Sequence, residues 1–241
     1  VRSTMLRTNL LAVVLLILWI NSSLAINVYL ASKKPDGSGV SNSKPSTNPD
    51  ISFDGKYVVY ESQANDILNG INYDNTFVYL FNREDDSNEL VSADGFTIAN
   101  HNSTNPKISG DGNYIIFLSA ATNLAGSVSN YMVFRKNVKS GAFSVVSTTS
   151  GGSKANTDVI AIDINYSGDG VVFESNATNL GVSPVGNYIY LKNITDSSLV
   201  CVSCPSTGNA DQATTNPHIN GAGDMIVFES TASNFGNVTN G

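Results

Sequence analysis

Oxygen-bearing side chains are closely spaced between Asp163 and Glu174. Five of them imitate the ligand spacing of a calcium-binding loop, with a glutamate at the twelfth position: Asp163, Asn165, Ser167, Asp169 and Glu174. The eighth position, however, is Gly170, where such a loop carries an apolar residue. Ser167, Asp169 and Glu174 also recur at matching positions elsewhere in the chain, so we interpret them as turn and strand residues. We expect no metal ion and no cofactor, and keep calcium as the weaker alternative.

Cys201 and Cys204 are the only cysteines and form a CxxC motif. A redox motif of this type is expected near a helix, whereas Pro205 follows here. A zinc site would need two more clustered ligands. On a continuous strand the two Cα atoms would lie roughly 10 Å apart, too far for a disulfide, but a turn at Ser203–Pro205 would bring them together. Core packing and a local disulfide in an oxidising compartment both remain open.

His101 and His218 are the only histidines, and neither stands in a recognisable nucleophile motif. A Ser-His-Asp site is assembled from residues that are distant in sequence, so residue spacing alone does not show whether one is present. The simplest interpretation is that both are solvated loop residues, and we expect no catalytic residue.

The wider pattern of the chain is a repeat. Four similar segments occur in order: Asn48–Leu68, Asn105–Leu124, Ile164–Leu180 and Asn216–Phe235. Their aligned aromatic residues are Tyr60, Phe117, Phe173 and Phe228, at spacings of 57, 56 and 55 residues. Near-equal spacing with matching residue types indicates a fold built from repeated units.

Each unit is predicted to contain four short strands. Asp-Gly pairs such as Asp54-Gly55 supply the positive φ of a tight hairpin between the first two strands. Runs of β-branched and aromatic residues predict second strands at Tyr57–Tyr60 and Tyr114–Phe117. The third strands are expected at Phe77–Phe81, Tyr131–Phe134 and Tyr188–Leu191, and the fourth at Leu90–Ser92, Val145–Ser147 and Val200–Ser203. Four antiparallel strands per unit are typical of a β-propeller blade, which must stack on its neighbours.

Two motifs connect these units with a known family. Pro-x-Ile-Ser-x-Asp-Gly stands at Pro106–Gly112, and Glu-Ser-x-Ala-x-Asn-Leu at Glu174–Leu180. With the later Val-Tyr and Val-Ser pairs, they resemble the TolB-like, WD-repeat-like β-propeller repeat family over nearly all of the chain after residue 25. The resemblance implies an all-β fold, a β-propeller of four-stranded antiparallel blades. It also implies a binding module, because that family consists mostly of such modules.

The repeat units are expected at about 48–92, 105–147, 158–204 and 216–241, the last being incomplete. About 3.5–4 blades are therefore present, whereas propellers typically have 4–8 and the family resembled usually has six or more. We expect the sequence to be a fragment of a larger ring, with a four-bladed ring as the alternative. Residues 26–32 are predicted to be the strand that closes the ring, which would remove free sheet edges.

The N-terminal segment, residues 1–25, has the pattern of a secretory signal peptide. Arg7 precedes an apolar run, Leu10–Ile20, and Ser23-Leu24-Ala25 is a small-x-small cleavage signature. The apolar run is shorter than the roughly 20 residues of a membrane-spanning helix. We therefore expect cleavage near Ala25, a secreted or periplasmic protein, and no membrane span in the mature chain.

Composition favours strands and turns and argues against nucleic acid as a partner. Charged residues make up 14% of the 241 residues, with 13 basic and 20 acidic side chains and a net charge of −7. Because Arg2 and Arg7 lie in the predicted signal peptide, the remaining chain is more acidic still. No cluster of lysine and arginine is present to contact phosphates.

These patterns favour a secreted or periplasmic module that binds a protein or cell-envelope component, without catalysis. The alternative is a propeller hydrolase or lyase that acts on a glycan or peptide. The less repetitive loops after the second strands and between units are expected to share one face. The predicted binding residues on that face are Asn72, Tyr73, Asp74, Phe96, His101 and Asn102. The sequence leaves the oligomeric state open.

Overall fold

A computed structural model describes residues 29–37, 44–71, 74–124, 128–182, 186–204 and 210–235. These residues form strands and turns and include no helix that could span a membrane. Residues Ala31–Gly241 form one compact unit and Val1–Leu30 another. Only Tyr29 and Leu30 of the smaller unit are described, so the predicted signal peptide lies outside the described residues.

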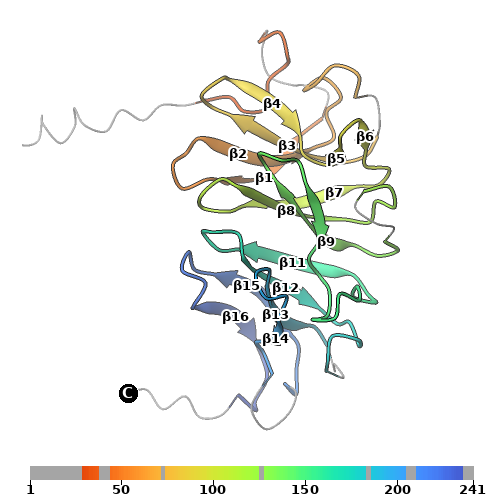
Figure 1. The fold of residues 1–241 in the computed structure, drawn as a ribbon, viewed down its shortest axis with the longest axis vertical. Helices are drawn as coiled ribbons and strands as arrows, with labels where there is room; N and C mark the ends of the chain where they lie inside the picture. The colour runs from red at the N-terminus through yellow and green to blue at the C-terminus, as the bar shows by residue number, and fades with distance from the viewer. Residues whose placement is uncertain are drawn as a thin grey trace, which may run out of the picture. The chain divides into compact units, whose positions relative to one another are not determined.

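The repeat units form antiparallel sheets, which we number as blades 1 to 4 (Figure 1). Blade 1 contains β1 (Ser46–Ile51), β2 (Tyr57–Ser62), β3 (Phe77–Asn82) and β4 (Ser87–Leu90). Blade 2 contains β7 (Ser103–Ile108), β8 (Tyr114–Ser119), β9 (Met132–Asn137) and β10 (Phe143–Val145). Blade 3 contains β11 (Val159–Ile164), β12 (Gly170–Ser175), β13 (Tyr188–Asn193) and β14 (Leu199–Cys201). Blade 4 is described as two strands, β15 (Thr214–Ile219) and β16 (Ile226–Ser230). The predicted all-β architecture of four-stranded antiparallel blades is confirmed.

The hairpin between the first two strands has the predicted turn chemistry. In blade 1 the Ser52 hydroxyl donates to the Asp54 carboxylate at 2.6 Å, and that carboxylate accepts the Lys56 N–H at 2.9 Å. Gly55 then adopts φ 68°, a left-handed conformation that favours glycine. Ser109 and Asp111 repeat the 2.6 Å contact in blade 2. These side-chain bonds explain why Ser-x-Asp-Gly recurs along the chain.

The fourth strands end earlier than predicted. The strands stop at Leu90, Val145 and Cys201, so the predicted ends at Ser92, Ser147 and Ser203 are wrong. The physical reason is the same in each blade, because the serine hydroxyl accepts a backbone N–H of the third strand. The donors are Val78, Val133 and Ile189, at 3.1, 3.1 and 2.9 Å. The serine hydroxyl thus takes the place of a backbone carbonyl as the acceptor for one N–H of the third strand. The fourth strand can therefore end there and the chain can leave the sheet.

Aromatic stacking forms the centre of each complete blade. Tyr60, Phe117 and Phe173 are buried and stack on Tyr79, Phe134 and Tyr190 of the adjacent strand, with ring centroids 5.6, 5.7 and 5.5 Å apart. The blades then pack in chain order. Strands β1 and β2 contact β7, β7 and β8 contact β11, and β11 and β12 contact β15. Stacked aromatic pairs add to the burial that holds each blade together.

The described chain before blade 1 covers part of the predicted ring-closing strand, residues 26–32. Residues 26–28 lie outside the described residues, and Tyr29–Ser32 contain no strand. The Ala31 carbonyl instead accepts the Asn88 side-chain N–H at 2.8 Å, and the Lys33 ammonium lies 5.6 Å from the centroid of the Phe81 ring. Ring closure by residues 26–32 stays a prediction.

The connection between blades 1 and 2 contains a small hairpin that the sequence analysis treated as loop. Its strands are β5 (Ala93–Asp94) and β6 (Thr97–Ile98), joined through Gly95 at φ 58°.

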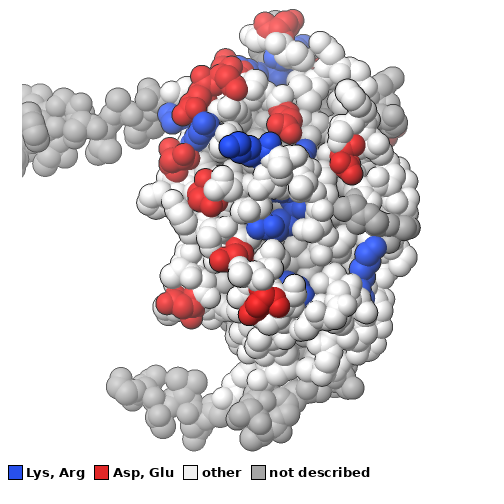
Figure 2. All heavy atoms as spheres, in the orientation of Figure 1, with Lys and Arg blue, Asp and Glu red and all other residues white. Residues whose placement is uncertain are grey.

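On the face shown in Figure 2, acidic side chains are spread widely, with lysine and arginine interspersed among them. This face therefore lacks the basic patch on which nucleic-acid binding depends.

Candidate functional site

The ends of the first strands are joined from blade to blade by backbone hydrogen bonds. Phe53 N–H donates to the Gly110 carbonyl at 2.9 Å, Asp111 N–H to the Tyr166 carbonyl at 2.9 Å, and Tyr166 N–H to the Gly221 carbonyl at 3.0 Å. These bonds bring one repeat position from all four blades into a row. The residues in that position are Phe53, Gly110, Tyr166 and Gly221.

Phe53 and Tyr166 meet across the blade between them. Their ring centroids lie 5.9 Å apart with an interplanar angle of 73°, an edge-to-face contact. A Cβ atom at Gly110 would lie 2.3 Å from the Tyr166 ring, so glycine is needed for the two rings to meet. Phe53 remains 84% exposed and Tyr166 47% exposed. We call Phe53, Gly110 and Tyr166 the aromatic lip.

A cavity of about 240 Å³ adjoins the aromatic lip. Ile108 and Ile164 supply apolar lining, and Asp50 and Asp163 supply carboxylates. Asp50 accepts the Ile108 N–H at 2.9 Å, and Asp163 accepts the Ile219 N–H at 3.0 Å. These bonds fix both carboxylates between adjacent blades. The cavity can therefore accept an apolar side chain and offers acidic oxygens to a neighbouring N–H or cationic group.

The residues of the imitated calcium loop do not converge on one point. The Asp169 carboxylate accepts the Ser167 hydroxyl at 2.6 Å and the Asn165 side-chain N–H at 2.7 Å. These two hydrogen bonds hold the pKa of Asp169 below its usual value. Buried Glu174 instead accepts the Asn187 side-chain N–H and the Asn216 backbone N–H, at 2.7 and 3.2 Å. Within the described ranges, no group of three or more histidine, cysteine or acidic side chains is placed to hold a metal ion.

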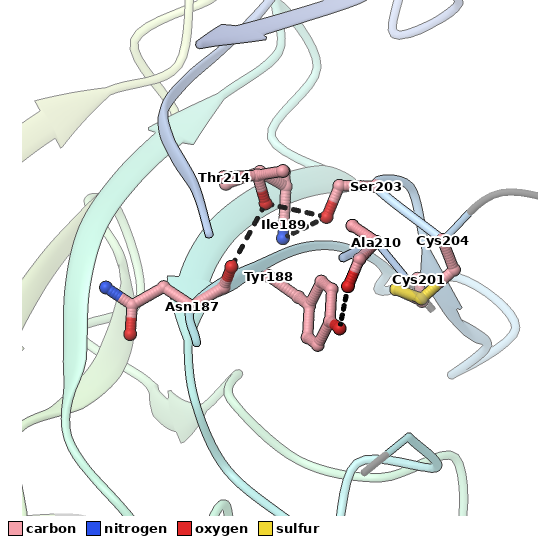
Figure 3. Close-up of a disulfide and its surroundings, with 8 residues drawn as sticks. All are labelled: Asn187, Tyr188, Ile189, Cys201, Ser203, Cys204, Ala210 and Thr214. Carbon is pink, nitrogen blue, oxygen red and sulfur yellow. Dashed lines mark hydrogen bonds between the residues drawn. A yellow bond between two sulfur atoms is a disulfide. The ribbon is translucent and has the colours of Figure 1, made fainter. Parts of the chain in front are cut away.

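Cys201 and Cys204 are joined by a disulfide, with Cα atoms 5.5 Å apart (Figure 3). The geometry arises because β14 ends at Cys201 and the chain turns, which shortens the distance expected for a continuous strand. Beside the bridge, the Ser203 hydroxyl accepts the Thr214 hydroxyl at 2.8 Å. Since Thr214 begins β15, these contacts fasten the end of blade 3 to the start of blade 4.

The structure describes four of the six residues of the binding face predicted from the sequence, and their role in binding stays a prediction. Asn72 and Tyr73 lie outside the described residues. The Asp74 carboxylate contacts the Lys44 ammonium at 3.1 Å and is fully exposed. The Asn102 side-chain oxygen accepts the Thr76 N–H at 2.9 Å, so Asn102 connects the loop after β2 to the segment before β7.

The two remaining residues of that predicted face have different surroundings. The His101 ring lies edge-on to Tyr131, with centroids 5.8 Å apart. Phe96, at the tip of the β5–β6 hairpin, is fully exposed beside a groove of about 590 Å³. Ser140 and Gly141 also line this groove. They belong to the turn between β9 and β10, which is neither a loop after a second strand nor a connection between units, so Phe96 is not surrounded only by the loops grouped with it in the prediction.

Sequence reasoning missed the aromatic lip because it compared the repeats for residues that they share. The signal lies in a repeat position that varies, with Phe53 and Tyr166 alternating with Gly110 and Gly221. A large aromatic residue at a turn position that is glycine in the neighbouring copy indicates that one copy's ring covers the next copy's backbone.

Comparisons with known proteins show the fold. No model of a known protein family matches the chain, and no curated protein matches it. Among solved structures, TolB from Acinetobacter baumannii has a TM-score of 0.50 at 16% identity, covering 79% of this chain and 39% of that chain. The β-propeller domain of the Trilobed protease from Pyrococcus furiosus has a TM-score of 0.43 at 13% identity, covering 65% of this chain and 41% of that one.

This chain thus spans about two fifths of the length of these two structures. The match to TolB agrees with the stacked four-stranded sheets and with the motifs at Pro106–Gly112 and Glu174–Leu180. The chain therefore has a TolB-like β-propeller fold.

Proposed function

We propose that this chain is a secreted or periplasmic propeller module that binds a protein partner, without catalysis, at the aromatic lip. The observation that carries the proposal is the exposed contact between Phe53 and Tyr166 over Gly110. Exposed aromatic residues are enriched at protein interfaces and dominate their binding energy. A rigid set of blades holds these two in place, so little conformational freedom is lost on binding.

The chemistry of the cavity supports an extended peptide segment as the bound part of the partner. An apolar side chain would enter beside Ile108 and Ile164, while the carboxylates of Asp50 and Asp163 face a flanking N–H or cationic group. Because the two rings meet edge to face, they do not form one continuous flat platform of the kind on which a sugar stacks. Among the described residues that line the cavity there is no serine or cysteine, and His218 Nδ1 lies 3.4 Å from the Asp163 carboxylate; a hydrolase or lyase stays the alternative.

Two features support export of the chain. The segment before Ala25 has the pattern of a signal peptide. The disulfide between Cys201 and Cys204 is of a kind that persists in oxidising compartments such as the periplasm or the extracellular space. N-terminal sequencing of the exported protein tests this part of the proposal. We expect Ile26 as the first residue, and recovery of the intact N-terminal segment in the membrane fraction would contradict it.

Peptide binding tests the proposed site. The probes are short extended peptides with a central tryptophan, leucine or glutamate, labelled for fluorescence anisotropy. We expect the tryptophan and leucine peptides to bind. Phe53→Ala and Tyr166→Ala should each weaken binding about tenfold or more, the range of interface hot spots. Asp74→Ala and His101→Ala are matched changes on the face predicted from the sequence. Loss of binding in these two alone would place the function there instead.

A further inference from the structure

The dipeptide Asn-Gly occurs twice in the described part of the chain, at Asn69-Gly70 and at Asn220-Gly221. A third copy, Asn240-Gly241, lies outside the described residues. In this dipeptide the backbone nitrogen of glycine can attack the side-chain carbonyl carbon of asparagine, because glycine has no Cβ atom to hinder the approach and adopts the required backbone conformations. The attack needs a side-chain amide that is free to turn toward the nitrogen. The surroundings of each asparagine therefore decide whether it reacts.

The side-chain amide of Asn220 is fixed in the hairpin between β15 and β16. Its oxygen accepts the backbone N–H groups of Gly223, Asp224 and Met225, at 3.0, 3.2 and 3.1 Å. Its nitrogen donates to the Asp224 carboxylate at 2.8 Å. For the Gly221 nitrogen to attack, the amide must leave these partners and break their hydrogen bonds. Asn220 is therefore protected by the turn that it stabilises, although it is exposed to solvent.

Asn69 has no such partners in the described part of the chain. It lies exposed in a turn of the loop after β2, and its side chain forms no hydrogen bond or ion pair with another described residue. Gly70 is exposed as well and adopts φ 86°, and a Cβ atom added there would meet nothing within 4 Å. The amide of Asn69 can therefore rotate toward the Gly70 nitrogen without losing a hydrogen bond to these residues.

Two buried side chains hold the ends of the turn that contains Asn69. Ile67 is fully buried and Ile71 is 8% exposed, and both belong to the hydrophobic core. Asp66, directly before Ile67, pairs with the Lys34 ammonium at 3.9 Å. The dipeptide thus faces solvent on a short segment that is fixed on both sides. A change in the length of this segment acts directly on the position of Ile71.

We propose that Asn69-Gly70 is a site of spontaneous modification, at which Asn69 converts to aspartate and isoaspartate while Asn220 stays intact. The Gly70 nitrogen forms a bond to the side-chain carbonyl carbon of Asn69, and the bond from that carbon to the NH₂ group breaks. Ammonia leaves with the proton of the Gly70 amide. Water then opens the five-membered imide ring. Opening at the side-chain carbonyl gives aspartate, and opening at the main-chain carbonyl gives isoaspartate, so no oxidant or reductant is needed.

The modification changes both the charge and the backbone of the loop. Either product replaces a neutral amide by a carboxylate, in a chain whose net charge is already −7. Isoaspartate also adds a carbon atom to the backbone between the buried anchors Ile67 and Ile71. The same loop carries the residues at 72–74 that the sequence places on a binding face. The aromatic lip consists of other residues, so this proposal is independent of peptide binding there.

Incubation of the folded, exported chain in mildly alkaline buffer, followed by peptide mapping with mass spectrometry, tests the proposal. Enzymatic methylation of isoaspartate distinguishes the two products. We expect Asn69 to convert at least about tenfold faster than Asn220, since breaking one or two of the hydrogen bonds of Asn220 accounts for that factor. The rate at Asn69 should rise with pH, because the attacking nitrogen must lose its proton. An intact Asn69, or an Asn220 that converts equally fast, would overturn the proposal.

The same incubation in concentrated urea separates the effect of the fold from that of the local sequence. In the unfolded chain both asparagines precede glycine without fixed partners, so their rates should become similar. A rate ratio that is the same in folded and unfolded protein contradicts protection by the hydrogen bonds of Asn220.

Anion-exchange chromatography of two variants gives an independent readout. Asn69→Gln should abolish the acidic species that accumulates in the parent protein, because glutamine would have to close a larger ring. Asn176→Gln is the matched control, since Asn176 is exposed but precedes alanine, and should leave that species unchanged. Thermal melting confirms that both variants are folded. An acidic species that persists at the parental rate in Asn69→Gln would place the reaction at another residue.

Discussion

Phe53 of blade 1 and Tyr166 of blade 3 are in edge-to-face contact over Gly110 of blade 2, with ring centroids 5.9 Å apart. The contact exists only because three blades stack in a fixed order and the middle one carries glycine. The exposed aromatic surface is therefore a product of blade packing rather than of a single loop. Changes at the glycine or at a blade junction should alter it without touching either ring.

Gly110→Ala is expected to separate the two rings. The added Cβ would lie 2.3 Å from the Tyr166 ring, which must move, and overpacking of this kind costs about 1–3 kcal/mol. Differential scanning calorimetry and the peptide assay should both register the change. Gly151→Ala is the control, because its Cβ would meet nothing closer than 3.8 Å. Equal melting temperatures and equal peptide affinities of the two variants would show that the position of the Tyr166 ring does not depend on Gly110.

Glu61→Gln is expected to weaken the junction between blades 1 and 2. The carboxylate accepts three hydrogen bonds, from the Thr47 hydroxyl, the Asn48 side chain and the Asn105 N–H. A glutamine must turn its NH₂ group toward at least one of these donors, and an unsatisfied buried group costs about 1–3 kcal/mol. Chemical denaturation measures the loss. Glu84→Gln is the control, because Glu84 forms an exposed ion pair with Lys56, and it should cost less than about 1 kcal/mol of unfolding free energy. A larger loss of unfolding free energy in Glu84→Gln than in Glu61→Gln would contradict the account.

Stability is expected to fall in acid partly through the hairpin aspartates. Hydrogen bonds from the Ser52 hydroxyl and the Lys56 N–H lower the pKa of Asp54, as those from Ser167 and Asn165 lower that of Asp169. A depressed pKa in the folded state means that the unfolded chain binds protons first as pH falls. The contribution to stability is thus complete above the ordinary aspartate pKa of about 3.9 and is lost as pH drops through the folded value.

The double variant Asp54→Asn with Asp169→Asn tests this linkage. Its melting temperature should lie below that of the parent at neutral pH, and the gap should narrow as the pH is lowered through the aspartate range. Parallel melting curves across that range would show that these hydrogen bonds do not couple folding to protonation.

Removal of the disulfide is expected to destabilise the chain modestly. The loop between Cys201 and Cys204 is short, and the chain-entropy argument gives about 2 kcal/mol for closing it. Chemical denaturation of Cys201→Ser with Cys204→Ser measures this loss. Alkylation of the exported parent protein under native and denaturing conditions is the companion measurement. Two reactive thiols in unreduced, denatured protein would contradict both the bridge and the oxidising compartment.

The strands could be predicted from the sequence because their signals are local. Asp54-Gly55 and the β-branched run after it specify a hairpin without reference to the rest of the chain. The early end of the fourth strands could not be predicted in this way, because it depends on the Ser92 hydroxyl reaching the Val78 N–H of the neighbouring strand. Hydrophobic periodicity does not reveal where a side-chain hydrogen bond replaces a backbone hydrogen bond.

The candidate site was less predictable because contacts between blades create it. Phe53 and Tyr166 are 113 residues apart in sequence (166 − 53), and only blade stacking brings them together. The CxxC pair shows the same limit on a smaller scale. The spacing left two interpretations open, and the turn after Cys201 decides between them.

Backbone amide NMR of the exported chain, with and without a short peptide carrying a central tryptophan, tests the central claim most directly. We predict that the largest shifts occur at Phe53, Gly110 and Tyr166, and that they saturate with a single affinity that Gly110→Ala weakens. Saturable shifts centred on Asp74 and His101, with the aromatic lip unchanged, would contradict the account and place the partner on the other loops.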